Sequence, residues 1–221
     1  PARGASGDVA AAAPCRPPPP AGRKRARQGR HPSIVPKILE PDTNLVIWRR
    51  GGSDRALGEA AFGYAAWLAS WAGELEVTLD DRGRPRGKPL PKGPGRDELL
   101  ADWAESLATF RELVGDHPID AKAAVVTSDK CRLFHADFNR LRWLCTYAGP
   151  GTEWVADGDV DRAALASGDI PPDEVNARLV PDLRRVQQVD AGDVILLKGQ
   201  DYPGNLGGAP STARRPSRRE G

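Results

Sequence analysis

CRLFHADFNRLRWLCTYAGPGTEWV, at Cys131–Val155, is the stretch that decides the fold. It contains the only His-x-Asp of the chain, formed by His135 and Asp137. A strand-like alternation follows, in which large side chains of one parity are Leu141, Trp143, Cys145 and Tyr147. Side chains two residues apart in an extended chain point to the same side, so the segment predicts a strand with one apolar and one mostly polar face.

The same parity, extended backwards, places His135, Asp137 and Asn139 on the apolar face. An imidazole and a carboxylate that meet inside a β-barrel or sandwich are how many non-haem iron sites begin. His135 and Asp137 are therefore candidate metal ligands.

Two helices are predicted upstream of this stretch, at about 54–72 and 97–114. Ser53 or Asp54 is the expected N-cap of the first. Apolar residues at helical spacing form the two faces: Leu57, Ala60, Ala61, Tyr64, Trp67, Leu68 and Trp71, then Leu99, Leu100, Trp103, Leu107, Phe110 and Leu113. Aromatic stripes of this kind usually pack into a core. Leu45–Trp48 is strand-like, and the Gly- and Pro-rich residues 80–96 form a loop.

Residues 121–199 are β-rich in composition. The patterns predict short strands at Thr152–Val155, Arg185–Val189 and Val194–Leu197, with one or two helical turns at Asp159–Ser167. Helices followed by strands indicate a single α+β domain over residues 32–206.

Basic tails flank this domain. Residues 1–31 are rich in Pro, Ala and Arg and carry seven Lys/Arg against Asp8; residues 214–221 carry four Arg against Glu220. The net charge of the whole chain is only +2, so the middle of the chain is acidic. Residues 1–31 and 207–221 are expected to be disordered. No aromatic residues interleave with the charges to stack bases, so nucleic acid is not the expected partner.

The three cysteines show neither a disulfide framework nor metal-ligand spacing, which favours a reducing cytoplasm. No apolar run approaches the roughly 20 residues that span a bilayer, so no membrane association is expected. The chain starts at Pro1 and has no methionine, which indicates a fragment or a processed form.

Two motifs carry a resemblance to a known family. They are FHADFNRLRWLCTYAGPGTEWV at Phe134–Val155 and GDVILLKG at Gly192–Gly199, with a weaker match, ILEPDTNLVIWRR, at Ile38–Arg50. Over roughly residues 34–206 the sequence resembles the bacterial family called domain of unknown function 1826 (DUF 1826). This family has no assigned activity, so the resemblance implies no particular chemistry.

The layout also resembles a broader group, the Fe(II)- and 2-oxoglutarate-dependent oxygenases, which place His-x-Asp at the end of one strand and a distal histidine several strands later. This resemblance implies an α+β protein whose two N-terminal helices pack on a cupin-like, double-stranded β-helix core. It implies Fe(II) ligation by His135 and Asp137, with 2-oxoglutarate as cosubstrate and an unidentified small-molecule or protein substrate. Gly192–Leu196 would form the strand before the distal histidine.

The chain departs from this pattern at its end, because no histidine follows His135. The resemblance implies a Gly-x-Val-His-Arg-Ser-Pro-Pro segment after GDVILLKG, whereas the chain reads GAPSTARRP at Gly208–Pro216. If the third base of each codon is read with the first two of the next, these codons can spell the expected segment. Its histidine would straddle Ser211 and Thr212.

We therefore expect a frameshift near Gly207, which puts residues 207–221 out of frame. The chain as given would then lack the third ligand, the basic residue for 2-oxoglutarate and the closing strands. An unpaired sheet edge would remain. Nucleotide reads across these codons test this expectation directly.

Several alternatives stay open for the candidate site. His135 and Asp137 could be a structural pair, and His31 or His117 could supply a third ligand. Among the other residues of the stretch, Arg140 and Arg142 are expected on a solvated face, and Cys145 in the core. Asn139 could either support a metal ligand or form a turn. Glu153 and Trp154 could either pack or line the entrance to a substrate site.

The leading functional hypothesis is a cytoplasmic non-haem Fe(II), 2-oxoglutarate-type oxygenase in its intact form, inactive as given. The alternative is a non-catalytic cupin-like module that binds a metal or a small ligand.

Overall fold

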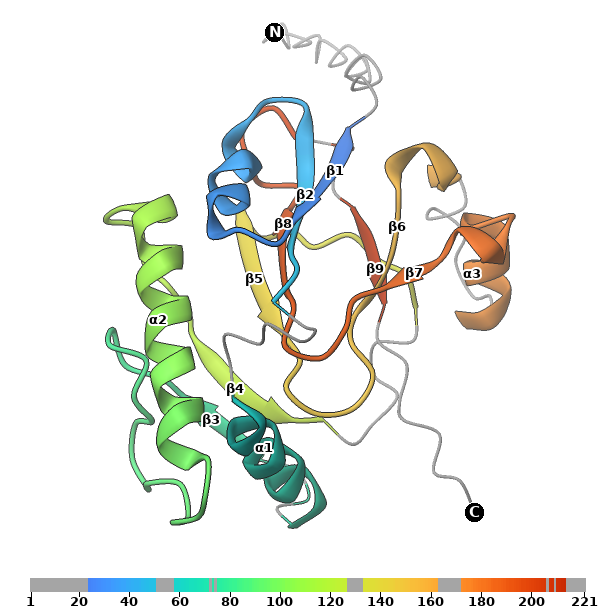
Figure 1. The fold of residues 1–221 in the computed structure, drawn as a ribbon. Helices are drawn as coiled ribbons and strands as arrows, with labels where there is room; N and C mark the ends of the chain where they lie inside the picture. Colours follow the sequence, from blue (N-terminus) through green and yellow to red (C-terminus); the bar gives the residue numbers. More distant parts are fainter. Residues whose placement is uncertain are drawn as a thin grey trace, which may run out of the picture.

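The computed structural model describes residues 24–50, 58–71, 73, 75–126, 133–162, 172–205, 207–208 and 210–213. These residues form an α+β structure with three sheets (Figure 1). The first sheet has the order β1 (Arg25–Gly29), β2 (Thr43–Trp48), β8 (Val194–Lys198) and β5 (Leu141–Cys145). The second has the order β7 (Gln187–Gln188), β6 (Glu153–Val155) and β9 (Ser211–Ala213); the third is the antiparallel pair of β3 (Leu75–Thr78) and β4 (Lys122–Val125).

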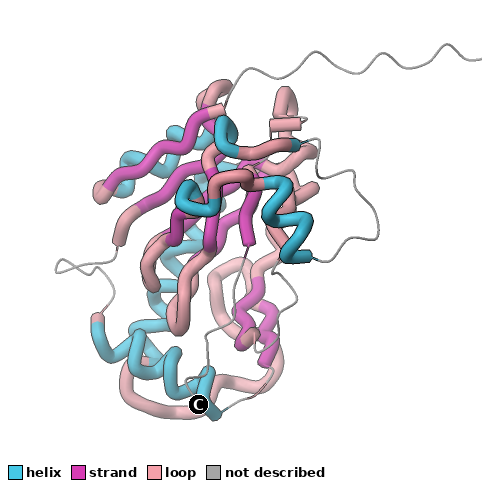
Figure 2. The backbone as a smooth tube through the Cα atoms, turned by 90° about the vertical axis from the view of Figure 1, so that its right-hand side faces the viewer, coloured by secondary structure: helices cyan, strands magenta, loops and turns pink. Residues whose placement is uncertain are grey.

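The helices are α1 (Glu59–Trp71), α2 (Arg96–Val114) and α3 (Pro172–Leu179), with short 3-10 helices η1 (Pro32–Leu39), η2 (Asp157–Asp159) and η4 (Leu183–Arg185). Figure 1 shows α2 on one side of the first sheet and α3 on the far side of the second. Figure 2 shows the two-stranded sheet lying apart from the two larger ones. No helix in the described part of the chain is both long and apolar enough to cross a membrane.

The two larger sheets pack face to face. Leu45 and Ile47 of β2, Ile195 and Leu197 of β8 and Trp154 of β6 form the cluster between them. The opposite face of the first sheet, with Val46, Trp48, Val194 and Leu196, is covered by residues of η1 and α2. Because β2 and β8 are covered on both faces, all their residues are buried.

Both predicted tails contain ordered strands, so their boundaries are corrected. Arg25–Gly29 forms β1, which pairs in parallel with β2, and Ser211–Ala213 forms β9. Arg27 does not belong to a free basic patch, because its guanidinium lies 2.5 Å from Glu40 Oε2 and 3.4 Å from Asp42 Oδ1. Composition alone missed these elements because both strands are short, and the partner of β9 lies far away in sequence.

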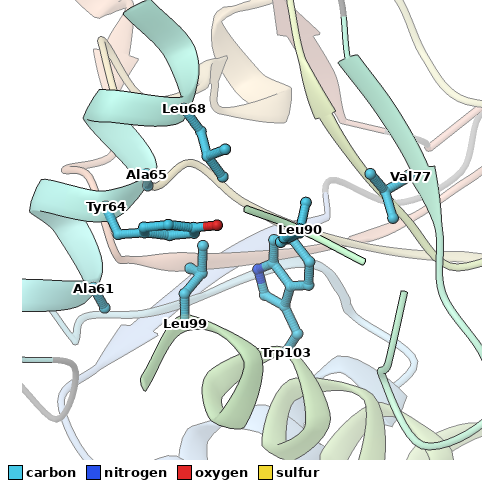
Figure 3. Close-up of a cluster of buried hydrophobic side chains, with 8 residues drawn as sticks. All are labelled: Ala61, Tyr64, Ala65, Leu68, Val77, Leu90, Leu99 and Trp103. Atoms are coloured by element: carbon cyan, nitrogen blue, oxygen red, sulfur yellow. The ribbon is translucent and has the colours of Figure 1, made fainter. Parts of the chain in front are cut away.

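The helix expected at about 54–72 appears as α1, Glu59–Trp71, while the expected N-caps Ser53 and Asp54 lie outside the described residues. Figure 3 shows Tyr64 and Leu68 of α1 packed against Leu99 and Trp103 of α2. The aromatic stripe is only partly core. Trp67 and Trp71 stack on each other, with ring centroids 5.6 Å apart, and are 41% and 64% exposed.

Two further expected elements have other bounds in the structure, and two observed helices were not expected. The strand expected at Arg185–Val189 is reduced to Gln187–Gln188. The helical turns expected at Asp159–Ser167 share only Asp159 with η2, and residues 163–167 lie outside the described part. Helix α3 and η1 were not predicted. The reason is that α3 is only eight residues long and η1 contains Pro32 and Pro36.

Candidate functional site

His135 lies beside the last described strand, β9. It forms an isolated antiparallel bridge with Thr212, in which the His135 N–H donates to Thr212 O over 3.1 Å and the Thr212 N–H donates to His135 O over 3.0 Å. Thr212 also pairs with Trp154, whose side chain packs between the two larger sheets. Directly opposite residues share a face, so the side chains of His135 and Thr212 lie on this inner side.

The loop after β8 holds the segment that carries Asp137. Three backbone bonds join the two segments: Gly199 N–H to Arg140 O (3.1 Å), Gln200 N–H to Asp137 O (2.8 Å) and Asp201 N–H to Phe138 O (3.3 Å). A Cβ atom on Gly199 would lie 1.7 Å from Asn139 O, so only glycine allows this approach. The GDVILLKG motif thus positions the His-x-Asp segment.

The imidazole of His135 and the carboxylate of Asp137 converge. His135 Nε2 lies 3.7 Å from Asp137 Oδ1. Its Nδ1 lies 2.9 Å from Leu133 O, and because a carbonyl only accepts, Nδ1 donates the proton of this hydrogen bond. In the neutral imidazole Nε2 then keeps its lone pair, and this form can bind a metal through Nε2.

One side-chain oxygen of Asp137 accepts a hydrogen bond, and the other has no partner among the described residues. Arg142 Nη1 donates to Oδ1 over 2.6 Å, whereas Oδ2 is buried and has no hydrogen-bond partner among the described residues. A buried carboxylate oxygen without a partner is costly unless something binds it. The carboxylate therefore keeps one acceptor oxygen that no described residue uses.

Two expectations about the faces of this stretch are wrong. Leu141, Trp143 and Cys145 pack toward η1 and α2, outside the space between the sheets. The other parity faces inward, because Arg142 is opposite Leu197 of the inter-sheet cluster. His135 reaches the inner side because residues 136–140 form no strand and break the parity.

Arg142 has a second role beside its contact with solvent, because it pairs with Asp137 while its side chain stays 41% exposed. It is the site residue that reasoning from the sequence missed. No local pattern identifies it, because the parity that it shares with Leu144 faces inward only through the break at residues 136–140.

The described residues do not supply a third ligand. No group of three or more His, Cys, Asp or Glu that could hold a metal exists within the described ranges. His31 caps η1 by accepting from the Ser33 N–H, and the Nε2 of His117 lies 3.5 Å from Arg140 Nη1. Asn139 is exposed. Trp154 is 3% exposed, as packing requires.

A second cluster of titratable groups lies where α2 meets the other face of the first sheet. The Arg50 guanidinium contacts both oxygens of Asp102, at 2.7 and 3.2 Å, and also donates to Cys145 Sγ over 3.3 Å. Tyr147 donates its hydroxyl to Asp102 Oδ2 over 2.6 Å. Burial raises the pKa of Tyr147 well above its usual range and that of the Cys145 thiol to about 11, so both stay protonated at neutral pH. This cluster fastens α2 to β5 and contains no ionised nucleophile.

The Cys145 thiol predicts a loss of stability at alkaline pH. Its folded pKa of about 11 lies above the ordinary value of 9.0, so the unfolded chain releases this proton first. The contribution of this group to the free energy of unfolding is constant below pH 9 and falls as the pH rises from about 9 to about 11. Urea unfolding at several pH values measures it. In Cys145→Ala this part of the slope should disappear, and an unchanged slope would contradict the assignment.

Comparison with known proteins gives one match. A family profile described as "Protein of unknown function (DUF1826)" matches residues 29–209. No curated protein and no solved structure matches the chain.

Proposed function

The chain belongs to the DUF1826 family, and from that premise and its site we propose that the intact protein is a non-haem Fe(II), 2-oxoglutarate-type oxygenase of the cytoplasm. The observation that carries the proposal is the convergence of His135 Nε2 on Asp137, whose Oδ2 is buried and has no partner among the described residues. A neutral imidazole and a carboxylate are two of the three ligands of the facial triad. Cytoplasmic placement rests on the absence of a disulfide framework in the cysteine pattern.

The position of β9 supports a third ligand next to this pair. Thr212 is the bridge partner of His135 and shares its inner face, while Ser211 is paired with Val155, which packs on the α3 side. Directly opposite residues of a bonded antiparallel pair have Cα atoms about 5.5 Å apart. A histidine at position 212 would therefore face His135 across one rung of the ladder.

The frameshift hypothesis fits this position. The histidine of the alternative frame falls at Ser211–Thr212, and the family match ends at residue 209, close to the expected shift near Gly207. We infer that the intact sequence carries its third ligand here and that the chain as given does not turn over. Face-to-face packing of the two larger sheets is compatible with a cupin-like, double-stranded β-helix core.

Each residue has a defined task in this proposal. Bound Fe(II) would supply oxygen activation, with 2-oxoglutarate as the source of two electrons, for hydroxylation of a small-molecule or protein substrate. The Leu133 carbonyl orients the His135 ring and leaves Nε2 available. Arg142 holds one oxygen of Asp137 and leaves Oδ2 available.

A second candidate is a non-catalytic cupin-like module that binds a metal or a small ligand. The ion pair of Arg142 with Asp137 favours the small-ligand form of this module, because the cation already neutralises the carboxylate that a metal would need. Succinate formation coupled to oxygen uptake separates the two, since only an oxygenase couples them.

The test is anaerobic Fe(II) binding by Thr212→His, measured by titration calorimetry. We expect this variant to bind Fe(II) at least about tenfold more tightly than the parent chain, equivalent to about 1.4 kcal/mol, because one more imidazole joins the pair. Adding His135→Ala should abolish the gain.

Ser211→His is the matched control, because its side chain lies on the opposite face of the same strand. Thermal melts establish that each variant is folded. If a folded Thr212→His binds no better than Ser211→His, His135 and Asp137 are a structural pair and the oxygenase proposal is wrong.

A further inference from the structure

Two of the three side chains that meet at the candidate site are held in place by backbone contacts. His135 is fixed by its two backbone bonds to Thr212 and by the contact of Nδ1 with Leu133 O. The Asp137 carbonyl accepts from the Gln200 N–H over 2.8 Å, and the Asp137 side chain is only 9% exposed. The imidazole and the carboxylate therefore have little freedom to move apart.

Arg142, the third member, is held at its charged end by a single contact. Its Nη1 donates to Asp137 Oδ1 over 2.6 Å, and no other hydrogen bond or ion pair joins its guanidinium to the part of the chain that the structure describes. The side chain is 41% exposed and projects from β5, which ends the first sheet because it pairs only with β8. A long cationic side chain in this setting can move its charged end into water.

The carboxylate that Arg142 holds is the one that a metal at this site would need. Oδ1, the oxygen that accepts from Arg142, lies 3.7 Å from His135 Nε2. A metal ion lies about 2.1 Å from an imidazole nitrogen and about as far from a carboxylate oxygen, so one ion can span this separation. An ion bound through Oδ1 would lie within about 5 Å of the guanidinium nitrogen on the same oxygen, where the two positive charges repel each other.

We propose that Arg142 is an internal competitor of the metal, a latch that occupies Asp137 in the metal-free protein and swings into solvent when a metal binds. This inference rests on the proposed function, because it concerns the same two ligands. A ligand that must wait for an internal partner to leave has an apparent affinity reduced by the fraction of time for which that partner is away. The Arg142 latch therefore sets the metal concentration at which the site fills.

Competition and support by Arg142 predict opposite effects of removing its charge. If Arg142 only held Asp137 in position for a metal, its loss would weaken metal binding, as the loss of a group that supports a metal ligand does. If Arg142 competes with the metal, its loss strengthens metal binding. The sign of the change therefore decides between the two roles.

The test is titration calorimetry of the chain as given with Zn²⁺, a redox-inert ion that accepts histidine and carboxylate ligands. Arg142→Gln should bind Zn²⁺ at least about tenfold more tightly than the parent chain, as expected if the latch is closed for at least about nine-tenths of the time. Arg140→Gln is the matched control, because Arg140 is an exposed cation of the same segment that lies beside His117. Its Kd should stay within about twofold of the parent value.

Two further variants secure the test. Adding His135→Ala to Arg142→Gln should abolish the gain, because the metal loses its imidazole ligand. Thermal melts establish that each variant is folded. Arg142→Met, which keeps an aliphatic stem opposite Leu197, replaces Arg142→Gln if the latter does not fold.

The outcomes separate the latch from the proposed function. Zinc binding that is equal or weaker in Arg142→Gln than in the parent overturns the latch and leaves the proposed function standing. An equal gain in Arg140→Gln, or a gain that survives His135→Ala, also overturns the latch. If neither the parent nor Arg142→Gln binds zinc, the latch is wrong as well, and the separate Fe(II) titration of Thr212→His decides the proposed function.

Discussion

Replacing Asp102 by alanine should lower the free energy of unfolding by about 3–5 kcal/mol, because it leaves a buried guanidinium without its partner. The side chains of Arg50 and Asp102 are 3% and 6% exposed. Asp102 also accepts from Tyr147, so the substitution orphans a second buried donor. Urea unfolding followed by circular dichroism measures the loss.

Asp97→Ala is the matched control on the same helix. Asp97 forms an ion pair with Arg96, but its side chain is 78% exposed, so removing it should cost no more than about 1 kcal/mol. Similar losses in the two variants would mean that the Arg50–Asp102 pair is not the fastening that the structure indicates.

Gly199→Ala should destabilise the fold on the order of 3 kcal/mol and loosen the candidate site with it. The added Cβ would overlap Asn139 O and lie 2.8 Å from Asp137 O, and neither backbone can retreat without breaking the bonds between the two segments. Faster amide exchange at Gln200, whose N–H donates to Asp137 O, measures the local effect alongside global unfolding.

Gly63→Ala is the matched control, and it should raise the free energy of unfolding where Gly199→Ala lowers it. A Cβ on Gly63 meets no atom within 4 Å, and the residue lies inside α1, where alanine is favoured over glycine by up to about 1 kcal/mol. If Gly199→Ala were as stable as the parent, the close approach of the two segments would not be required for folding.

Local patterns in the sequence predict helices and strands better than they predict which strands pair. A spacing of 3.6 residues correctly predicts the buried face of α2, which contains Leu99, Trp103 and Leu107. It fails for Trp67 and Trp71, because burial depends on what tertiary structure places opposite each side chain. β7, with two residues, carries too few side chains for a period to appear, and β1, RARQG, has no large apolar residues to form one.

Some residues of the candidate site could be predicted from the sequence and others could not. His135 and Asp137 could be chosen from their spacing, and the structure brings them together. Arg142 could not be assigned, because the break in strand geometry at residues 136–140 changes which parity faces inward. The role of Gly199 depends on contact with a segment far away in sequence, which no local pattern encodes.

The pairing of β2 with β8 has a consequence for how the chain is made. Leu45 is opposite Leu197, so the two central strands of the first sheet come from opposite ends of the domain. Sheets built from such distant segments fold slowly, because a long loop must close before the contacts form. A ribosome that synthesises this chain releases the fully apolar run Leu45–Trp48 long before its antiparallel partner exists. During that interval the run is a natural client for a chaperone.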